Sequence, residues 1–228
     1  MHIKFLKKLI RKRKNINSLK EIMKKNTLYL PKDVNLQKLH IKIKGKNNTI
    51  KIAEGLAIKN VLGIEGYLDN SVIEIGENFT CGSVYFQLGQ DHKNFGKIRN
   101  VSIKIGDNTS WEGGRLVLFN SNSYVEIGKE CMFASNVTIF NTDAHPIFKE
   151  GTAEIINRIK GVEIGNHVWL GMNATVLKNS HVPSNSIVAW GSVFSGVGGG
   201  SIASMLESPL NVLKGILIGA LKDQNLVT

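Results

Sequence analysis

Cysteine is scarce in this 228-residue chain, and no hydrophobic run is long. Its two cysteines, Cys81 and Cys131, cannot supply the disulfide framework of a small secreted domain, and their spacing fits no zinc motif. We expect both to be small buried residues in a reducing compartment. No apolar run reaches the roughly 20 residues that span a bilayer. The apolar stretch 5–10 contains two lysines and meets a basic run, unlike a signal peptide. These absences predict a cytoplasmic protein.

Acidic residues are also few, 18 against 29 lysines and arginines, which gives a net charge of +11. Residues 1–25 hold ten of the basic residues and one acid, so the rest of the chain has nineteen basic and seventeen acidic residues. A nucleic-acid-binding domain spreads positive charge and aromatic platforms over a folded face, so we expect no nucleic-acid partner. Apolar residues alternate with the lysines as in a short basic amphipathic helix. That helix either packs on the end of the fold or touches an anionic membrane surface, at the inner face of the cell membrane.

A six-residue repeat from Ile164 to Val193 is the strongest pattern in the chain. Every lead position is aliphatic, and the position four places later is small. The lead residues are Ile164, Leu170, Val176, Val182 and Val188, and the small ones are Val168, Ala174, Ser180, Ser186 and Ser192. A period of six fits neither a helix nor a simple strand. It predicts an all-β fold, a parallel β-helix whose interior is filled by the branched residues.

The same signature occurs upstream with interruptions. Ile75–Gly76, Ile105–Gly106 and Ile127–Gly128 open further repeats, in which Gly or Asn can take positive φ at a tight corner. We expect residues 39–195 to form the β-helix, with loops over 87–100 and 141–161. Residues 1–38 form a basic helical segment in this prediction. Residues 196–228 form a glycine-rich linker and a C-terminal helix that begins at Ser208 and Pro209.

Three phrases support a family resemblance: 136–139 (NVTI), 143–146 (DAHP) and 164–171 (IGNHVWLG). In this order they resemble the left-handed parallel β-helix acyltransferases of the hexapeptide-repeat family, and within it the sugar O-acetyltransferases that modify bacterial capsular and other surface polysaccharides. The resemblance implies transfer of an acetyl group from acetyl-CoA, as co-substrate, to a sugar hydroxyl. It also implies a homotrimer with active sites at subunit interfaces and no bound cofactor.

His145 is the candidate general base. It lies in the second predicted loop, between a regular repeat and Pro146, and an imidazole exchanges a proton near neutral pH. In the similar enzymes the histidine at this point deprotonates the acceptor hydroxyl. Asp143 and Asn141 are the candidate residues that orient it. His92, in the first predicted loop, is the rival base or a residue that contacts the acceptor.

The resemblance also implies an acetyl-CoA channel. Trp169 in the VWLG phrase lines that channel in the similar enzymes, and we assign Gly171, Gly191 and Ser192 to it as well. Trp190 stands where the family has a small residue, and we assign it to stacking on a sugar ring. After Ser195 the chain lacks the family's basic residue and proline, so we assign Lys178 or the basic N-terminus to the CoA phosphate.

Two other functions stay open. One is an N-acyltransferase that uses the same base on an amino-sugar nucleotide, and the other is a β-helix scaffold without catalysis. A zinc site of three histidines needs a close pair on one coil, which His145, His167 and His181 do not offer, so we expect no metal.

Overall fold

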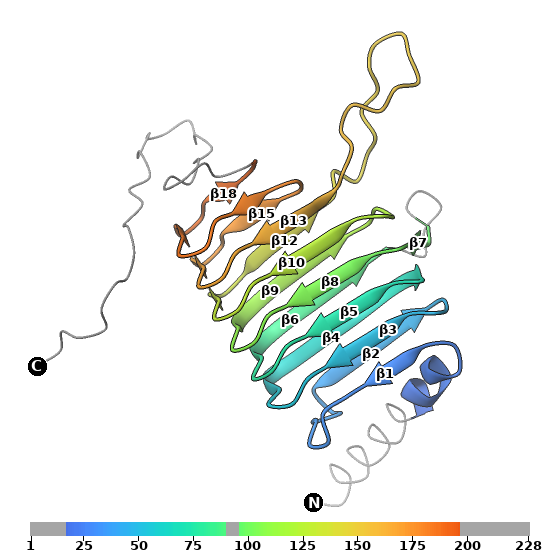
Figure 1. Ribbon diagram of the computed structural model, residues 1–228, viewed down its shortest axis with the longest axis vertical. Helices are drawn as coiled ribbons and strands as arrows, with labels where there is room; N and C mark the ends of the chain where they lie inside the picture. Colours follow the sequence, from blue (N-terminus) through green and yellow to red (C-terminus); the bar gives the residue numbers. More distant parts are fainter. Residues whose placement is uncertain (1–16, 90–95, 197–228) are drawn as a thin grey trace, which may run out of the picture.

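The computed structural model describes residues 17–89 and 96–196, which form a left-handed parallel β-helix with three faces (Figure 1). The fold predicted from the six-residue repeat is confirmed. The predicted C-terminal helix and most of the predicted basic N-terminal helix lie outside the described residues. No helix in the described part of the chain is long and apolar enough to cross a membrane.

Each coil contributes one strand to the first face, and all neighbouring pairs on this face are parallel. Its strands are β1 (Thr27–Tyr29), β3 (Thr49–Ile52), β5 (Val72–Ile75), β8 (Ser102–Ile105), β10 (Tyr124–Ile127), β13 (Gly161–Ile164) and β16 (His181–Val182).

The second and third faces share one sheet, because three long strands run along both. These are β4 (Ala57–Asp69), β6 (Thr80–Leu88) and β9 (Ser110–Leu118). The second face also has β11 (Met132–Phe133), β14 (Trp169–Leu170) and β17 (Ile187–Val188). The third has β2 (Leu39–Lys44), β12 (Val137–Asn141), β15 (Thr175–Leu177) and β18 (Val193–Phe194), while β7 (Ile98–Arg99) pairs with the end of β4.

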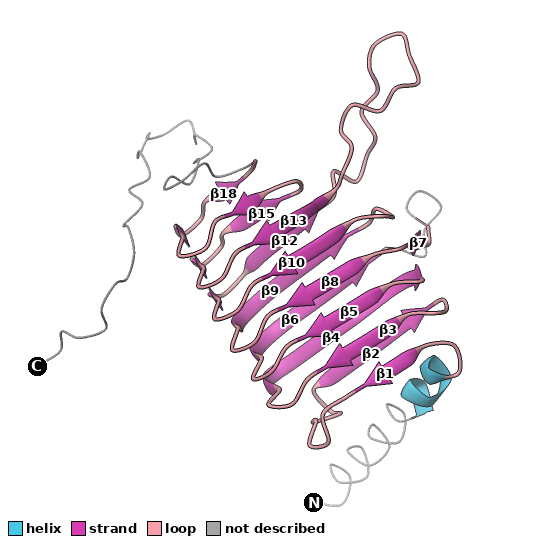
Figure 2. Cartoon of the chain, viewed as in Figure 1, coloured by secondary structure: helices cyan, strands magenta, loops and turns pink. Residues whose placement is uncertain are grey.

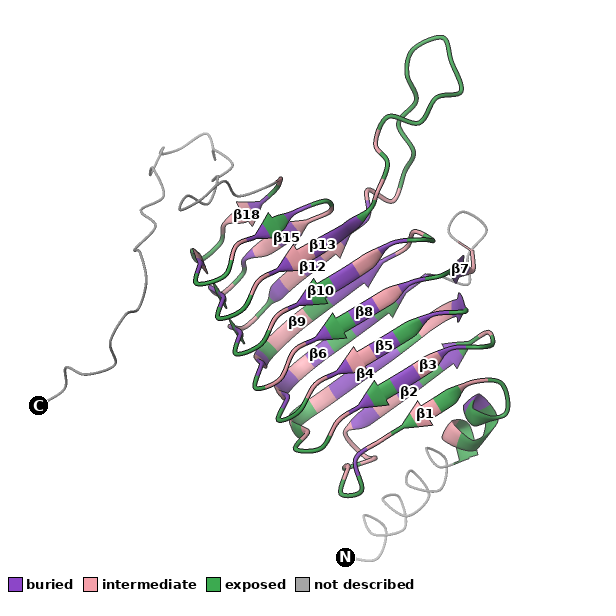
Figure 3. Ribbon diagram, viewed as in Figure 1, coloured by how far each residue is buried: buried purple, intermediate pink, exposed green. Residues whose placement is uncertain are grey.

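The interior holds the residues that the repeat predicts. All five lead residues from Ile164 to Val188 are buried, and each lies in register with a lead residue of a neighbouring coil on its face, as in the column Ile105, Ile127, Ile164 and Val182. Figure 3 shows the alternation of buried and exposed residues along the strands. Both cysteines are buried, as predicted, and burial raises the pKa of the Cys81 thiol to about 12. A thiol with that pKa is protonated and unreactive at neutral pH.

Asparagine, more than glycine, turns the corners. The left-handed conformation occurs at Asn47, Asn70, Asn78, Asn100, Asn108, Asn122, Asn136, Asn173, Asn179 and Asn185, among others. Stacked pairs bond to each other: Asn136 Nδ2 donates to Asn173 Oδ1 at 2.7 Å. The glycines that follow Ile75, Ile105, Ile127 and Ile164 have a different purpose: a Cβ on Gly106, for example, would lie 2.6 Å from the backbone carbon of Gly128. These glycines therefore allow the coils to stack closely.

The regular stack is interrupted at the corner between the third and first faces. The first interruption separates β6 from β7, and residues 90–95 within it lie outside the described chain. The second is a protruding hairpin over residues 142–160 between β12 and β13 (Figure 2), which we call the insertion. A short helix over residues 17–23 covers the first coil, and its Ile22 is buried against the core.

A polar cluster crosses the upper coils of the first face. The Tyr124 hydroxyl donates to Glu163 Oε1, and His181 Nδ1 lies 2.9 Å from Glu163 Oε2. The Tyr124 hydrogen bond, with a smaller effect of His181, lowers the pKa of Glu163, and the same bond is the main cause that raises the pKa of Tyr124 to about 12. Gly161 makes room for the cluster, because a Cβ there would lie 2.7 Å from the Tyr124 ring.

We expect Tyr124→Phe to destabilise the protein at neutral pH but not in acid. A carboxyl with a lowered folded pKa stabilises the fold above its unfolded pKa of roughly 4.3, and that contribution disappears as the pH falls through the folded pKa. The Glu163 side chain is 44% exposed, so solvent screening limits the loss to about 1 kcal/mol at pH 7. Urea unfolding at pH 7 and pH 3 measures it, with Tyr29→Phe on the same face as control. An equal loss at both pH values would contradict the assignment.

Candidate active site

His145 lies in a cleft of about 570 Å³ at the corner where the insertion leaves the stack. The cleft is lined by Lys97 and Ile98 and by residues 119–122 of the preceding corner. Residues from the two legs of the insertion, outgoing over 142–146 and returning over 155–159, complete the lining. His145 is exposed, and its ring has no hydrogen-bond partner among the described residues. Its imidazole is therefore accessible to a substrate.

A single side chain ties the two legs of the insertion together. Asn157 Nδ2 donates to Asp143 Oδ2 at 2.7 Å and to the carbonyl oxygen of His145 at 2.8 Å, and Asn157 Oδ1 accepts from the N–H of Ile147 at 2.7 Å. Sequence reasoning missed Asn157, because nothing in its local sequence indicates that it pairs with residues ten to fourteen positions earlier. It fixes the backbone on which His145 stands.

Asp143 does not contact the His145 ring, contrary to its predicted role. Its Oδ2 accepts from Asn157 and lies 2.8 Å from Lys178 Nζ. Both partners are partly buried beside it, and these two donors satisfy the carboxylate oxygen. Lys178, predicted at the CoA phosphate, is the cation in this ion pair. The two residues hold the base of the insertion against the following coil.

Asn141 does not orient the histidine either. It is fully buried at the end of β12, and its Nδ2 donates to the carbonyl oxygen of Tyr124 at 3.0 Å. Its Oδ1 has no partner within the described residues. The side chain therefore anchors the root of the insertion in the interior.

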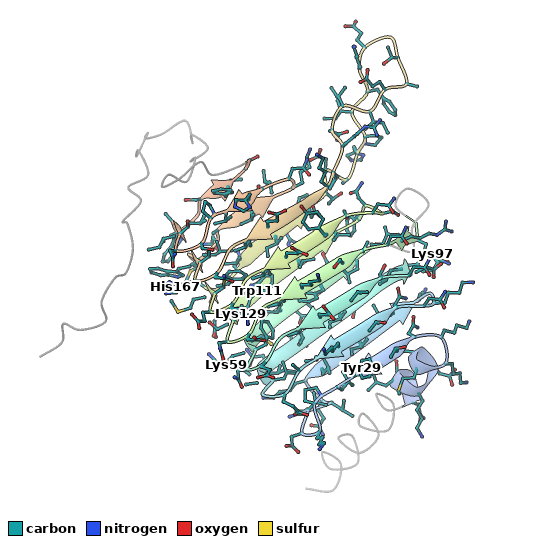
Figure 4. All side chains as sticks on the ribbon, viewed as in Figure 1. Tyr29, Lys59, Lys97, Trp111, Lys129 and His167 are labelled. Atoms are coloured by element: carbon teal, nitrogen blue, oxygen red, sulfur yellow. The ribbon has the colours of Figure 1, made fainter. Side chains whose placement is uncertain are left out.

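The two exposed tryptophans, Trp169 and Trp190, lie on another side of the molecule. Trp169 of β14 is 46% exposed and stands in register with Met132 and Ile187, and the three line an apolar hollow of about 200 Å³ on the second face. His167 at the edge of this hollow and Lys97 at the cleft of His145 lie at opposite edges of the prism (Figure 4). A single chain therefore does not bring His145 and Trp169 together.

The predicted channel residues Gly171, Gly191 and Ser192, and Trp190, predicted to stack on a sugar ring, lie on the coil of Trp169 or on the next coil. Trp190 is 69% exposed on the next coil, and Gly191 has a φ of 68° at the corner between the second and third faces. A Cβ on Gly171 would lie 2.8 Å from the backbone nitrogen of Trp190, so this glycine lets the two coils approach. Ser192 follows on the same turn, and its N–H donates to the carbonyl oxygen of Ala189 at 3.2 Å. His92 lies outside the described residues.

Cations predominate around His145. Lys97 and Arg158 line the cleft, and no carboxylate does so in the described part of the chain. Lys97 Nζ lies 3.0 Å from Asp69 Oδ2, and this hydrogen bond is the main cause of a raised pKa of Lys97. Arg99 lies on the flanking strand β7, and Lys160 directly precedes β13. Neither side chain forms an ion pair among the described residues. No group of three metal-ligating side chains occurs within residues 17–89 and 96–196.

No protein-family model matches the chain. The polysialic acid O-acetyltransferase of Neisseria meningitidis is 34% identical over 147 residues, which cover 59% of this chain and 67% of that protein. Two solved structures resemble the fold over 82% of this chain. One is the polySia-specific acetyltransferase NeuO, with a TM-score of 0.56, 22% identity and 91% of its chain covered. The other is the polysialic acid O-acetyltransferase OatWY, with a TM-score of 0.50, 27% identity and 94% covered.

The three-faced β-helix and these relatives together define an acyltransferase of the hexapeptide-repeat class. Within that class, the chain belongs to the hexapeptide-repeat O-acetyltransferases, to which the Neisseria meningitidis enzyme is similar. The family and the enzyme class predicted from the sequence are thereby confirmed.

Proposed function

We propose that the chain transfers an acetyl group from acetyl-CoA to a hydroxyl of an anionic polysaccharide, with polysialic acid as the first candidate, and that His145 is the general base. The observation that carries the proposal is the cleft of His145, which no carboxylate lines in the described chain: Arg158 forms no ion pair there, and Lys97, paired with Asp69, is the second cation. Every sugar unit of polysialic acid carries a carboxylate, and the relative from Neisseria meningitidis is named for this polymer. Opposite charges favour such an acceptor over a neutral glycan.

The chemistry needs one proton carrier. An acceptor hydroxyl in the cleft gives its proton to His145 while its oxygen attacks the thioester carbonyl of acetyl-CoA. The tetrahedral oxyanion collapses, the carbon–sulfur bond breaks, and the CoA thiolate takes the proton from His145. Asn120 also lines the cleft, and its Oδ1 is buried without a partner among the described residues.

The acetyl-CoA channel belongs, in this proposal, to the second face, where Trp169 and Trp190 are exposed and Gly171 and Gly191 keep the coils close. Because His145 and Trp169 stand at different edges of one chain, a site that uses both needs a second copy. This supports the homotrimer with sites at subunit interfaces. The insertion carries exposed apolar residues that an assembly would cover, namely Ile147, Phe148, Ile155 and Ile156.

A mixture of two inactive variants tests the shared site. We expect His145→Ala and Trp169→Ala to be nearly inactive alone, and enzyme purified from cells that express both to regain activity. In randomly mixed oligomers about a quarter of the interfaces carry both native side chains. A mixed preparation no more active than the mean of its two parents would show that each chain builds its own site.

Cytoplasmic localisation and membrane contact through residues 1–25 stay predictions. The acceptor class is tested by thiol release from acetyl-CoA with polysialic acid, with the same polymer after carboxyl reduction, and with amino-sugar nucleotides. We expect stimulation by the anionic polymer alone. Stimulation by an amino-sugar nucleotide would favour an N-acyltransferase, and no stimulation by any acceptor would favour a scaffold.

A further inference from the structure

A second and larger hollow lies on the same edge of the molecule as the cleft of His145. It has a volume of about 750 Å³ and lies between the helix over residues 17–23 and the ends of β2 and β4. Four lysines, a tyrosine and two glutamates contribute to its lining; the lysines are Lys24, Lys25, Lys42 and Lys44. Figure 1 shows the helix, β7 and the insertion along one edge of the prism. We call this hollow the cap groove.

One side-chain contact joins the cap groove to the cleft of His145. Tyr67 lines the cap groove and Lys97 lines the cleft, and Lys97 Nζ lies 4.9 Å from the centroid of the Tyr67 ring. Asp69 holds the lysine in this place. From β2, at the cap groove, to β12, which leads to His145, the third face advances by four strand spacings, roughly 19 Å. The separation of the two hollows is therefore longer than one sugar ring.

The cap groove attracts anions. Its two acids are already paired with its own cations: Lys24 Nζ lies 2.8 Å from Glu21, and Lys42 Nζ lies 2.7 Å from Glu65. Both pairs are largely exposed, so each is weak and can be exchanged for a carboxylate of a ligand. Lys25 is exposed and forms no ion pair among the described residues. Without counting Lys44, three lysines against two glutamates leave the groove positive, and the excess charge is that of Lys25.

We propose that the cap groove is a second binding site for the acceptor, holding a stretch of the same anionic polysaccharide several sugar units away from the hydroxyl in the cleft. This inference rests on the proposed function. Binding at two points along one chain raises the effective concentration of the next hydroxyl at His145. The enzyme then prefers long acceptors to short ones.

The double variant Lys25→Ala/Lys42→Ala tests the cap groove. For a long polysialic acid we expect kcat/KM to fall about five- to thirtyfold, the loss for two surface cations, with kcat unchanged at saturation. For an oligomer too short to reach from His145 to the groove, no change is expected. The matched control is Lys51→Ala/Lys104→Ala, which removes two exposed lysines from the first face.

Three outcomes would overturn the proposal: a long acceptor affected no more than in the control, an equal loss for short and long acceptors, or a fall in kcat alone. If the wild-type enzyme acetylates no anionic acceptor, the proposed function fails separately. In that case the affinity of polysialic acid for the wild type and for the double variant tests the cap groove directly. Equal affinities, or no binding by either protein, would exclude the groove as a binding site for this polymer.

Discussion

Replacement of His145 by alanine is expected to reduce acetyl transfer about 10²- to 10⁴-fold, the usual contribution of a positioned general base. The side chain is exposed, and its ring has no partner among the described residues, so its loss leaves no buried group unpaired. Folding should therefore be unchanged. Thiol release from acetyl-CoA in the presence of the acceptor measures the rate, and circular dichroism verifies the fold.

His181→Ala is the matched control for this experiment. His181 is also exposed, but it lies on β16 of the first face and contacts Glu163 outside the cleft. We expect the control to keep its activity. If His145→Ala turns over at a rate close to that of the wild type, the base is another residue, and His92 is the next to replace.

Trp111→Ala is expected to cause the largest loss of stability, about 3–5 kcal/mol. The Trp111 side chain is fully buried and lies against Phe86, with ring centroids 6.2 Å apart, and edge-on to Phe133 at 5.3 Å. Its Nε1 donates to the carbonyl oxygen of Gly113 at 3.0 Å. Truncation removes the middle one of three interior rings that come from three successive coils, and leaves a cavity. Urea unfolding at one fixed protein concentration gives the difference, since assembly also contributes to apparent stability.

Trp190→Ala is the matched control for Trp111, because it removes the same side chain from a site that is 69% exposed. We expect a change within roughly 0.5 kcal/mol. A loss at Trp111 no larger than at Trp190 would mean that the coils close around the vacant space.

The sequence predicts the scaffold well because the repeat is a local property. A lead residue such as Ile164 faces inward whatever happens elsewhere in the chain, and the buried columns follow from this rule. The same reasoning predicts that Trp169 faces outward, as it does. The repeat does not predict on which of the three faces a residue lies, because the coils differ in length. The register advances 22 residues from Ser102 to Tyr124 but 18 from Glu163 to His181.

The site was predicted less well because its contacts are not local. Lys178 meets Asp143 across 35 positions, and Asn157 meets the turn of His145 only after the insertion has folded back on itself. A carboxylate two residues before a histidine suggests a pair, but the structure directs Asp143 to these more distant donors. The cap groove was not predicted either, because it forms only when the helix over residues 17–23 covers the first coils.

The insertion leaves the stack after β12 and returns at β13 without disturbing the register around it. β12 pairs with β9 and β15, and β13 pairs with β10 and β16, so the coils on either side align as if the hairpin were not there. The part of the insertion beyond the turn of His145, residues 147–156, can therefore change in length and sequence while the prism stays the same and Asn157 still closes the turn. The acceptor range of such an enzyme can diverge, or be redesigned, by exchange of a single graftable segment between His145 and Asn157.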